Sequence, residues 1–188
     1  MSPCDSHSER ERCPDIASVS VVIPVFNSAT ILPRLVDRLE SVLAGSATQY
    51  ELVLVNDGSR DASWKSIQAL CRGHRWVRGV NLIRNFGQHN ATLAGIRMAR
   101  YEVIVTMDDD LQQPPEEIPN LLRLLNQGVD VVYGTPERDE HARPRVWAAR
   151  LTKLMLERMM GVNSATTVTS FRAFRTELRS AFASFSGE

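Results

Sequence analysis

The strongest constraint on the fold is the alternation of short β-branched runs with helical stretches between residues 19 and 133. The apolar runs are only a few residues long, so each predicts a buried strand. Between them, apolar residues recur at helical spacing and predict helices that cover the strands. This alternation predicts an α/β fold, with a mainly parallel central sheet flanked by helices. The expected strands lie at residues 19–23, 52–55, 77–83, 103–107 and 130–133.

Three consecutive carboxylates follow the strand expected at residues 103–107. In an extended segment Asp108 and Asp110 point to one side and Asp109 to the other. Two carboxylates aimed at one point repel each other unless a cation lies between them, and oxygen ligands favour Mg2+ or Mn2+, which also bind substrate phosphates. The pattern is therefore a candidate metal–diphosphate site, and an acidic surface loop that caps the next helix is the competing interpretation.

Polar residues also follow the first two expected strands. Pro24, Phe26 and Asn27 follow the first strand, and Asp57 follows the second within a turn-like Asn-Asp-Gly-Ser segment. In a parallel sheet these residues lie at the same edge as the acidic triplet and can converge on one ligand. Backbone near Pro24 and Phe26 can line a pocket for a base, and Asp57 can accept a hydrogen bond from a base N–H. Taken singly, each segment also fits an ordinary turn.

Composition and missing motifs exclude several classes of protein. Basic and acidic residues number 22 each, so the chain lacks the basic excess typical of nucleic-acid binding. No G-x-G-x-x-G follows a strand and no G-x-x-x-x-G-K-[ST] occurs, which disfavours Rossmann-type NAD binding and P-loop phosphate binding. No apolar run reaches about 18 residues, so no membrane-spanning helix is predicted. Three cysteines and no signal-peptide pattern predict free thiols and a cytoplasmic location.

The order and spacing of five segments resemble those of family 2 inverting glycosyltransferases with the GT-A fold. The segments are SVVIPVFN, ELVLVNDGSRD, LIRNFGQHNATLAGI, TMDDDLQQPPEEIP and DVVYG. The resemblance covers about residues 19–175 and is strongest to the polyprenyl-phosphate glycosyltransferases, which include dolichol-phosphate mannose synthases and undecaprenyl-phosphate 4-deoxy-4-formamidoarabinose transferases. It implies a metal-dependent enzyme, using Mg2+ or Mn2+, that transfers a sugar with inversion from a nucleotide-diphosphate sugar to an acceptor.

The resemblance also implies a role for each matching residue. Asp108 and Asp110 would be catalytic acids that bind the metal, with Gln112 as a third metal-proximal and substrate-binding residue. Pro24, Phe26 and Asp57 would contact the base, and Asn27 and Asp109, which stand in the same motifs, complete the substrate-binding candidates. Arg172 would be a catalytic arginine that meets phosphate.

Three positions depart from the family pattern. Ser28 replaces a nucleotide-contacting Glu, Pro136 stands where an Arg is usual, and Thr166 replaces an Asp near the catalytic centre. The resemblance implies that the last change leaves the general base in question. A phosphate monoester has a second pKa of roughly 6 and is mostly dianionic at pH 7, so it needs no such base. A polyprenyl phosphate is therefore the expected acceptor, and the alternatives are transfer to a sugar hydroxyl or nucleotide-sugar binding without turnover.

The remaining segments predict the domain organisation. Residues 1–18 are polar and predict a disordered N-terminal tail, and residues 19–188 form the catalytic domain, which we expect to be truncated at its C-terminal end. A helix expected from Pro144 to Met160 is basic on one side and apolar on the other. It predicts either a core-packed helix or peripheral contact with an anionic membrane, at the inner face of the cell membrane.

Overall fold

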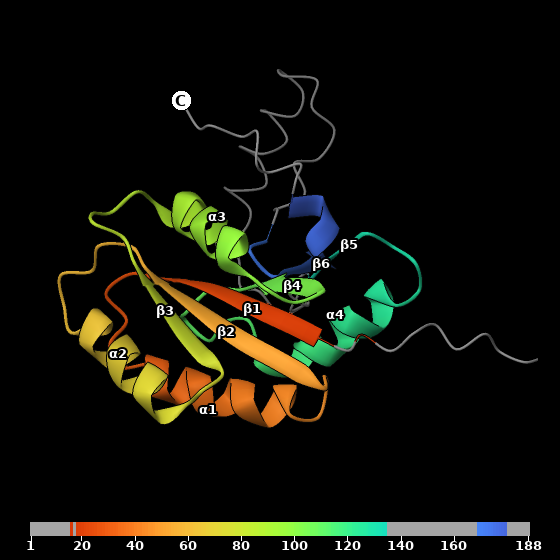
Figure 1. The fold of residues 1–188 in the computed structure, drawn as a ribbon, viewed down its shortest axis with the longest axis horizontal. Helices are drawn as coiled ribbons and strands as arrows, with labels where there is room; N and C mark the ends of the chain where they lie inside the picture. The colour runs from red at the N-terminus through yellow and green to blue at the C-terminus, as the bar shows by residue number, and fades with distance from the viewer. Residues whose placement is uncertain (1–15, 17, 135–168, 180–188) are drawn as a thin grey trace, which may run out of the picture.

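The computed structural model describes residue 16, residues 18–134 and residues 169–179. Within them, strands form one sheet in the order β3-β2-β1-β4-β6-β5 (Figure 1). The strands are β1 Ser18–Val25, β2 Gln49–Asn56, β3 Val77–Asn81, β4 Val103–Thr106, β5 Val131–Tyr133 and β6 Arg172–Arg175.

The central strands run parallel, which confirms the mainly parallel α/β sheet expected from the sequence. β1 pairs with β2 on one side and with β4 on the other, and β2 pairs with β3. In this register Val25 lies opposite Asn56, so β1 and β2 end level with each other. The segments that follow β1, β2 and β4 therefore emerge at one edge of the sheet, where ligands bind in open α/β folds.

One strand runs against the others. β6 lies between β4 and β5 and is antiparallel to both, with Arg172 opposite Thr106 and Tyr133. The sequence predicts a strand leading into a short helix near residues 166–174, and β6 followed by the short helix η2 Thr176–Leu178 fits that expectation. Its position between β4 and β5 is not evident from the sequence, and it brings Arg172 to the carboxyl end of β4.

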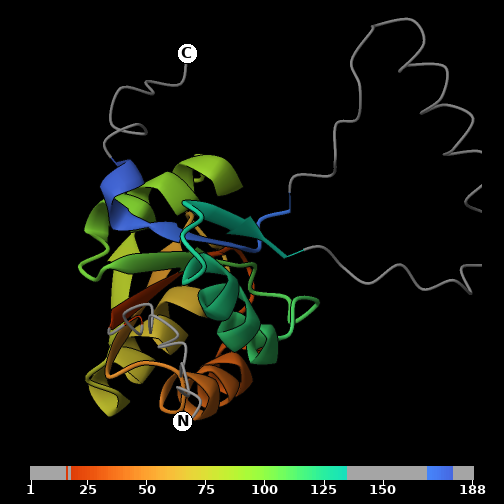
Figure 2. The ribbon, with the colours of Figure 1, turned by 90° about the vertical axis from the view of Figure 1, so that its right-hand side faces the viewer.

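Helices cover both faces of the sheet. The helices α1 Leu32–Leu43, α2 Ser63–Gly73 and α4 Ile118–Leu125 share one apolar core with one face, and η1 Pro115–Glu117 leads into α4 (Figures 1 and 2). The helix α3 Gln88–Met98 packs on the other face, against Val22, Val53 and Val55, and Leu178 of η2 joins the same cluster. It lies so close that a Cβ on Gly95 would come within 2.3 Å of the Val22 Cγ1 atom.

Ordered structure begins inside the expected N-terminal tail. Ile16 is buried in the core at 6% exposure, and Ser18 begins β1. The rest of the predicted tail, residues 1–15 and 17, lies outside the described residues.

Several expectations fall on parts of the chain that are not described. They are the helix from Pro144 to Met160 and the departures at Pro136 and Thr166. Within the described part, no helix has the length and hydropathy needed to cross a membrane.

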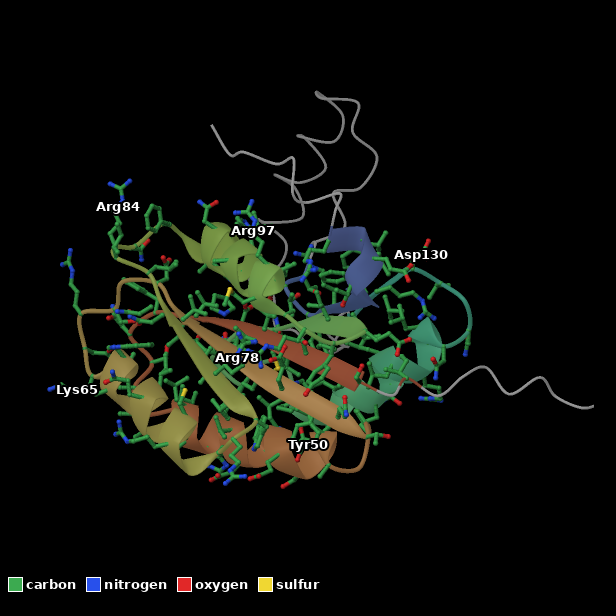
Figure 3. The ribbon with its side chains drawn as sticks, in the orientation of Figure 1. Tyr50, Lys65, Arg78, Arg84, Arg97 and Asp130 are labelled. Carbon is green, nitrogen blue, oxygen red and sulfur yellow. The ribbon has the colours of Figure 1, made fainter. Side chains whose placement is uncertain are left out.

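A buried carboxylate fastens the C-terminal end of α3 to the sheet. Glu51 on β2 is 3% exposed, and its Oε1 atom accepts hydrogen bonds from the Ser20 hydroxyl and the Arg100 N–H, both at 2.8 Å. Its Oε2 atom pairs with Nη1 of Arg78 at 2.8 Å, and the same nitrogen donates to the Met98 carbonyl at 3.0 Å. Figure 3 shows Arg78 reaching from β3 beneath α3. The cluster therefore fixes where α3 ends.

Replacing Arg78 tests this cluster. We expect Arg78→Met to lower the free energy of unfolding by about 3 kcal/mol, because it leaves the Glu51 charge buried without its ionic partner. Urea denaturation measures the change. Arg175→Met is the matched control, since its 3.4 Å pair with Glu102 is solvent-exposed and contributes less than about 1 kcal/mol. Equal losses in the two variants would contradict the assignment.

Candidate active site

A cavity of about 290 Å3 lies at the carboxyl edge of the sheet. Its lining comes from the ends of β1 and β2, the turn before α3 and the segment after β4. Among the sequence candidates it brings together Pro24, Phe26, Asp57, Asp108, Asp109 and Asp110. Four of these are carboxylates, and no lysine or arginine belongs to the lining. The cavity is therefore acidic and lacks a compensating cation among these residues.

Asp108 is held by neutral donors from three separate segments. Its Oδ1 atom accepts from Nε2 of Gln88, the first residue of α3, at 2.5 Å. Its Oδ2 atom accepts from Nε2 of Gln113 at 3.0 Å and from the Ser170 hydroxyl at 2.5 Å. Within the described residues, the carboxylate is therefore oriented by neutral donors and not by an ion pair.

Asp109 and Asp110 line the cavity together with Asp108, contrary to the alternation expected for an extended strand. The reason is that β4 ends at Thr106 and the chain then turns, with Leu111 in a left-handed conformation at φ 59°. Asp110 is exposed, and its Oδ1 atom accepts from the Gln112 N–H at 3.0 Å. All three acids can therefore act on one ligand.

The pKa of Asp109 is raised above its ordinary value. Burial is the main cause, and the negative charge of Asp110 acts in the same direction. Hydrogen bonds from Ser28 and from the Phe26 N–H, the latter at 3.3 Å, oppose the rise. Ser28 thus contacts a cavity carboxylate, although it replaces the residue usual in the family.

Asp57 anchors the turn that leads into α3. It is 3% exposed, and its two oxygens accept hydrogen bonds from the Phe86 N–H at 2.7 Å and the Gly87 N–H at 3.0 Å. Arg84, which precedes this turn, points outward from the body of the protein, as Figure 3 shows. Asp57 therefore shapes one wall of the cavity through backbone contacts.

The loop after β1 is fastened to the loop after β2. Asn27, at φ 56°, accepts on Oδ1 from the Arg60 N–H at 2.9 Å, and its own N–H donates to the Ser59 hydroxyl at 3.0 Å. The Ala29 N–H donates to the Asp61 carboxylate at 3.2 Å. Asn27 does not line the cavity, because its side chain is engaged in this contact between the loops.

The two glutamines after the acidic triplet differ in position. Gln112 is exposed and does not line the cavity, whereas Gln113 is partly buried and contacts Asp108. The sequence interpretation selected Gln112, whereas the side chains that contact Asp108 in the structure are Gln113, Gln88 and Ser170. Gln88 and Gln113 lie in two of the five segments that carry the family resemblance, which is a usable signal, but nothing in the sequence marks Ser170.

Arg172 lies near the cavity without lining it. It is opposite Thr106, whose hydroxyl donates to the Ser170 carbonyl at 2.5 Å. Its Nε atom is buried and has no hydrogen-bond partner within the described part of the chain. An unpaired guanidinium N–H is suited to a phosphate oxygen.

The carboxylates fit a divalent cation only in part. Among the described residues, no group of three or more His, Cys, Asp or Glu side chains is arranged to hold a metal ion. Mg2+ and similar ions, however, are often bound by one or two carboxylates and complete their coordination with water and substrate phosphates. The oxygens of Asp108 and Asp110 on one cavity wall fit that mode of binding.

Residues 20–182 match the family model described as glycosyl transferase family 2. An undecaprenyl-phosphate 4-deoxy-4-formamido-L-arabinose transferase from Pseudomonas paraeruginosa is 42% identical over 161 residues, which are 85% of this chain and 48% of the relative. A transferase of the same name from Shewanella sediminis is 39% identical over 162 residues, 86% of this chain and 49% of the relative. The chain thus spans about half the length of the curated relatives it matches.

Solved structures show the same fold at lower identity. A mannosyltransferase from Pyrobaculum calidifontis, in complex with GDP-Man and Mn2+, superimposes with a TM-score of 0.61 at 19% identity, covering 89% of this chain and 47% of that chain. A glucosyl-3-phosphoglycerate synthase from Mycobacterium tuberculosis, with Mn2+, UDP-glucose and phosphoglyceric acid, gives 0.62 at 18% identity, covering 86% and 57%. The expected GT-A fold is confirmed.

Gly58 tests how the cavity wall is assembled. It has φ +64°, and a Cβ there would lie 2.4 Å from the Asn85 backbone nitrogen. We expect Gly58→Ala to lower the free energy of unfolding by about 1–3 kcal/mol through backbone strain, and to speed hydrogen exchange at the Phe86 and Gly87 amides.

Gly73→Ala is the control, because nothing lies within 4 Å of a Cβ at this helical position. It is expected to be neutral or to stabilise by up to about 1 kcal/mol. Equal stability of the two variants, measured by urea denaturation, would contradict the assembly of the wall around Gly58.

Proposed function

The chain belongs to glycosyl transferase family 2, and from this premise we propose that it transfers a sugar, with inversion, from a nucleotide-diphosphate sugar to a polyprenyl phosphate. The observation that carries the proposal is the acidic cavity at the carboxyl edge of the sheet, whose described lining includes four carboxylates and no lysine or arginine. A nucleotide diphosphate is itself anionic and would be repelled there. A divalent cation that bridges both removes the repulsion, and Mg2+ or Mn2+ is suited to these oxygen ligands.

The donor would lie across the ends of β1, β2 and β4. Phe26 is 46% exposed at the rim and can present its ring to a base. Each oxygen of Asp57 accepts one backbone N–H, which leaves a lone pair for a base N–H. Asp108 and Asp110 would hold the ion beside the diphosphate, as ligands supplied by the chain.

In the transfer, an oxygen of the acceptor phosphate attacks the anomeric carbon from the face opposite the diphosphate. The new carbon–oxygen bond forms as the bond to the diphosphate breaks, and the nucleoside diphosphate leaves with the electron pair. The bound cation supplies charge neutralisation for this leaving group. The Arg172 guanidinium binds phosphate, and no side chain needs to remove a proton because the acceptor is already dianionic.

The acceptor is inferred from two lines of support. Relatives that are about 40% identical are named for transfer to undecaprenyl phosphate. Thr166 stands where the family has an aspartate, and a phosphate acceptor is the class that tolerates this loss. Such an acceptor resides in a membrane, so the chain would act at the inner membrane face, with the residues from Pro144 to Met160 as the expected contact.

Nucleotide binding tests the donor site. We expect UDP, GDP or dTDP to bind with Mn2+ in a calorimetric titration, and Asp108→Asn or Asp110→Asn to weaken that binding at least about 10-fold by removing a charged ligand. Asp37→Asn, on the exposed side of α1, is the control and should bind normally. Tight nucleotide binding that does not depend on Mn2+ would contradict the proposed metal–diphosphate site.

Sugar transfer tests the acceptor. The chain is incubated with labelled uridine, guanosine or thymidine diphosphate sugars, Mn2+ and undecaprenyl phosphate, and label in the lipid extract is counted. We expect label in the lipid and a loss of at least about 100-fold in Asp110→Asn, because charge stabilisation of the leaving group is removed. Label only on sugar or protein hydroxyls would refute the phosphate acceptor. Metal-dependent nucleotide binding without any transfer would favour a binding module.

A further inference from the structure

We infer that Gln113 and Ser170 are positioning residues, which orient Asp108 so that its Oδ1 atom alone faces the cation. The inference rests on the proposed function, because it concerns the ion that the donor diphosphate requires. It adds two residues outside the D-x-D pattern, and it assigns different tasks to the two oxygens of one carboxylate.

Gln113 grips Asp108 at two points. Its Oε1 atom accepts from the Asp108 backbone N–H at 3.0 Å, and its Nε2 atom donates to Asp108 Oδ2, also at 3.0 Å. The same Nε2 atom donates to the Ser170 hydroxyl at 2.7 Å, and that hydroxyl donates in turn to Asp108 Oδ2 at 2.5 Å. The ring fixes the main chain and the carboxylate of Asp108 together, so the side chain cannot rotate alone.

The two oxygens of Asp108 accept different numbers of hydrogen bonds. A carboxylate oxygen has two lone pairs, and both on Oδ2 are used by Gln113 and Ser170. Oδ1 accepts a single bond, from Gln88 at the start of α3. One lone pair of Oδ1 therefore remains for a cation, and coordination by Asp108 is through one oxygen.

The neutrality of these donors matters as much as their geometry. Two other carboxylates of the described chain are held by arginine instead: Glu51 pairs with Arg78 at 2.8 Å, and Glu116 pairs with Arg38 at 2.5 Å. An arginine at Asp108 would cancel the charge that attracts the ion. An amide and a hydroxyl orient the carboxylate and leave its full negative charge in place.

Ser170 also connects Asp108 with the strand that carries Arg172. It lies two residues before Arg172, and its carbonyl accepts from the Thr106 hydroxyl at 2.5 Å. A shift of this segment therefore moves Asp108 Oδ2 and the arginine proposed to bind phosphate at the same time.

Metal affinity measures the effect directly. The full chain is titrated with Mn2+ at saturating UDP, and free Mn2+ is followed by electron paramagnetic resonance. We expect Gln113→Met and Ser170→Ala to weaken Mn2+ binding by about 10-fold, as is typical when the partner of a metal ligand is lost. Ser170→Thr keeps the hydroxyl and should restore affinity to within about 3-fold of the original chain.

Matched controls separate positioning from general damage. Gln68→Met and Ser41→Ala make the same changes on the exposed sides of α2 and α1 and should leave Mn2+ affinity unchanged. Urea midpoints are measured for every variant, so that affinity is compared only between folded proteins. An affinity loss in Ser170→Thr as large as in Ser170→Ala would overturn the positioning role.

The two proposals fail in different ways. Normal Mn2+ binding by the original chain together with unchanged affinity in Gln113→Met and Ser170→Ala would overturn this inference and leave the proposed function intact. Absence of Mn2+ binding in the original chain would overturn the proposed metal site, and with it the positioning role.

Discussion

Four carboxylates share one cavity at the carboxyl edge of the sheet, and no lysine or arginine lines it among residues 18–134 and 169–179. Their mutual repulsion has to be balanced by the fold in the absence of a ligand. Asp57, Asp108 and Asp109 each accept hydrogen bonds from neutral donors, and burial raises the pKa of Asp109. These contacts hold the acids in place but leave their charge uncompensated. A ligand that brings positive charge would suit these acids, in keeping with the proposed binding of a cation together with a diphosphate.

Contacts at both ends of α3 hold the helix in place, and with it the hydrogen-bond donor Gln88 at the cavity. At its first residue, Gln88 donates to Asp108, and near its last turn the Met98 carbonyl accepts from Arg78. Between these points Gly95 allows the helix to approach Val22 closely. Rigid placement of a helix that carries a donor keeps the donor within the short range that a hydrogen bond tolerates. The Glu51 cluster, at the opposite edge of the sheet, thereby contributes to the geometry of the site.

The class of fold was predictable, because the spacing of apolar residues in strands and helices is a local property of the sequence. The edge that carries the candidate site was predictable for the same reason, because the polar residues directly follow the strands. The antiparallel insertion of β6 was not, because strand pairing depends on contacts between residues far apart in the chain. The role of Asn27 as a link between loops was missed for the same reason. Which of Gln112 and Gln113 contacts Asp108 depends on the left-handed backbone at Leu111. A leucine rarely adopts this conformation, so the sequence does not predict it.

The overall charge balance of the chain conceals a local separation of charge. Lysine plus arginine equals aspartate plus glutamate over the whole sequence, so composition suggests no preference for any ligand. In the structure, the acids gather at the carboxyl edge of the sheet, whereas Arg97, Arg100 and Arg179 line a groove near the C-terminal end of α3, with Glu102 and Glu177. Arg78 neutralises Glu51 within the fold, whereas no arginine of the described residues pairs with Asp108, which agrees with its proposed role as a ligand of an ion. The partners of each acid, rather than the number of charges, therefore distinguish Glu51, which is paired with arginine, from the acids proposed to bind the ligand.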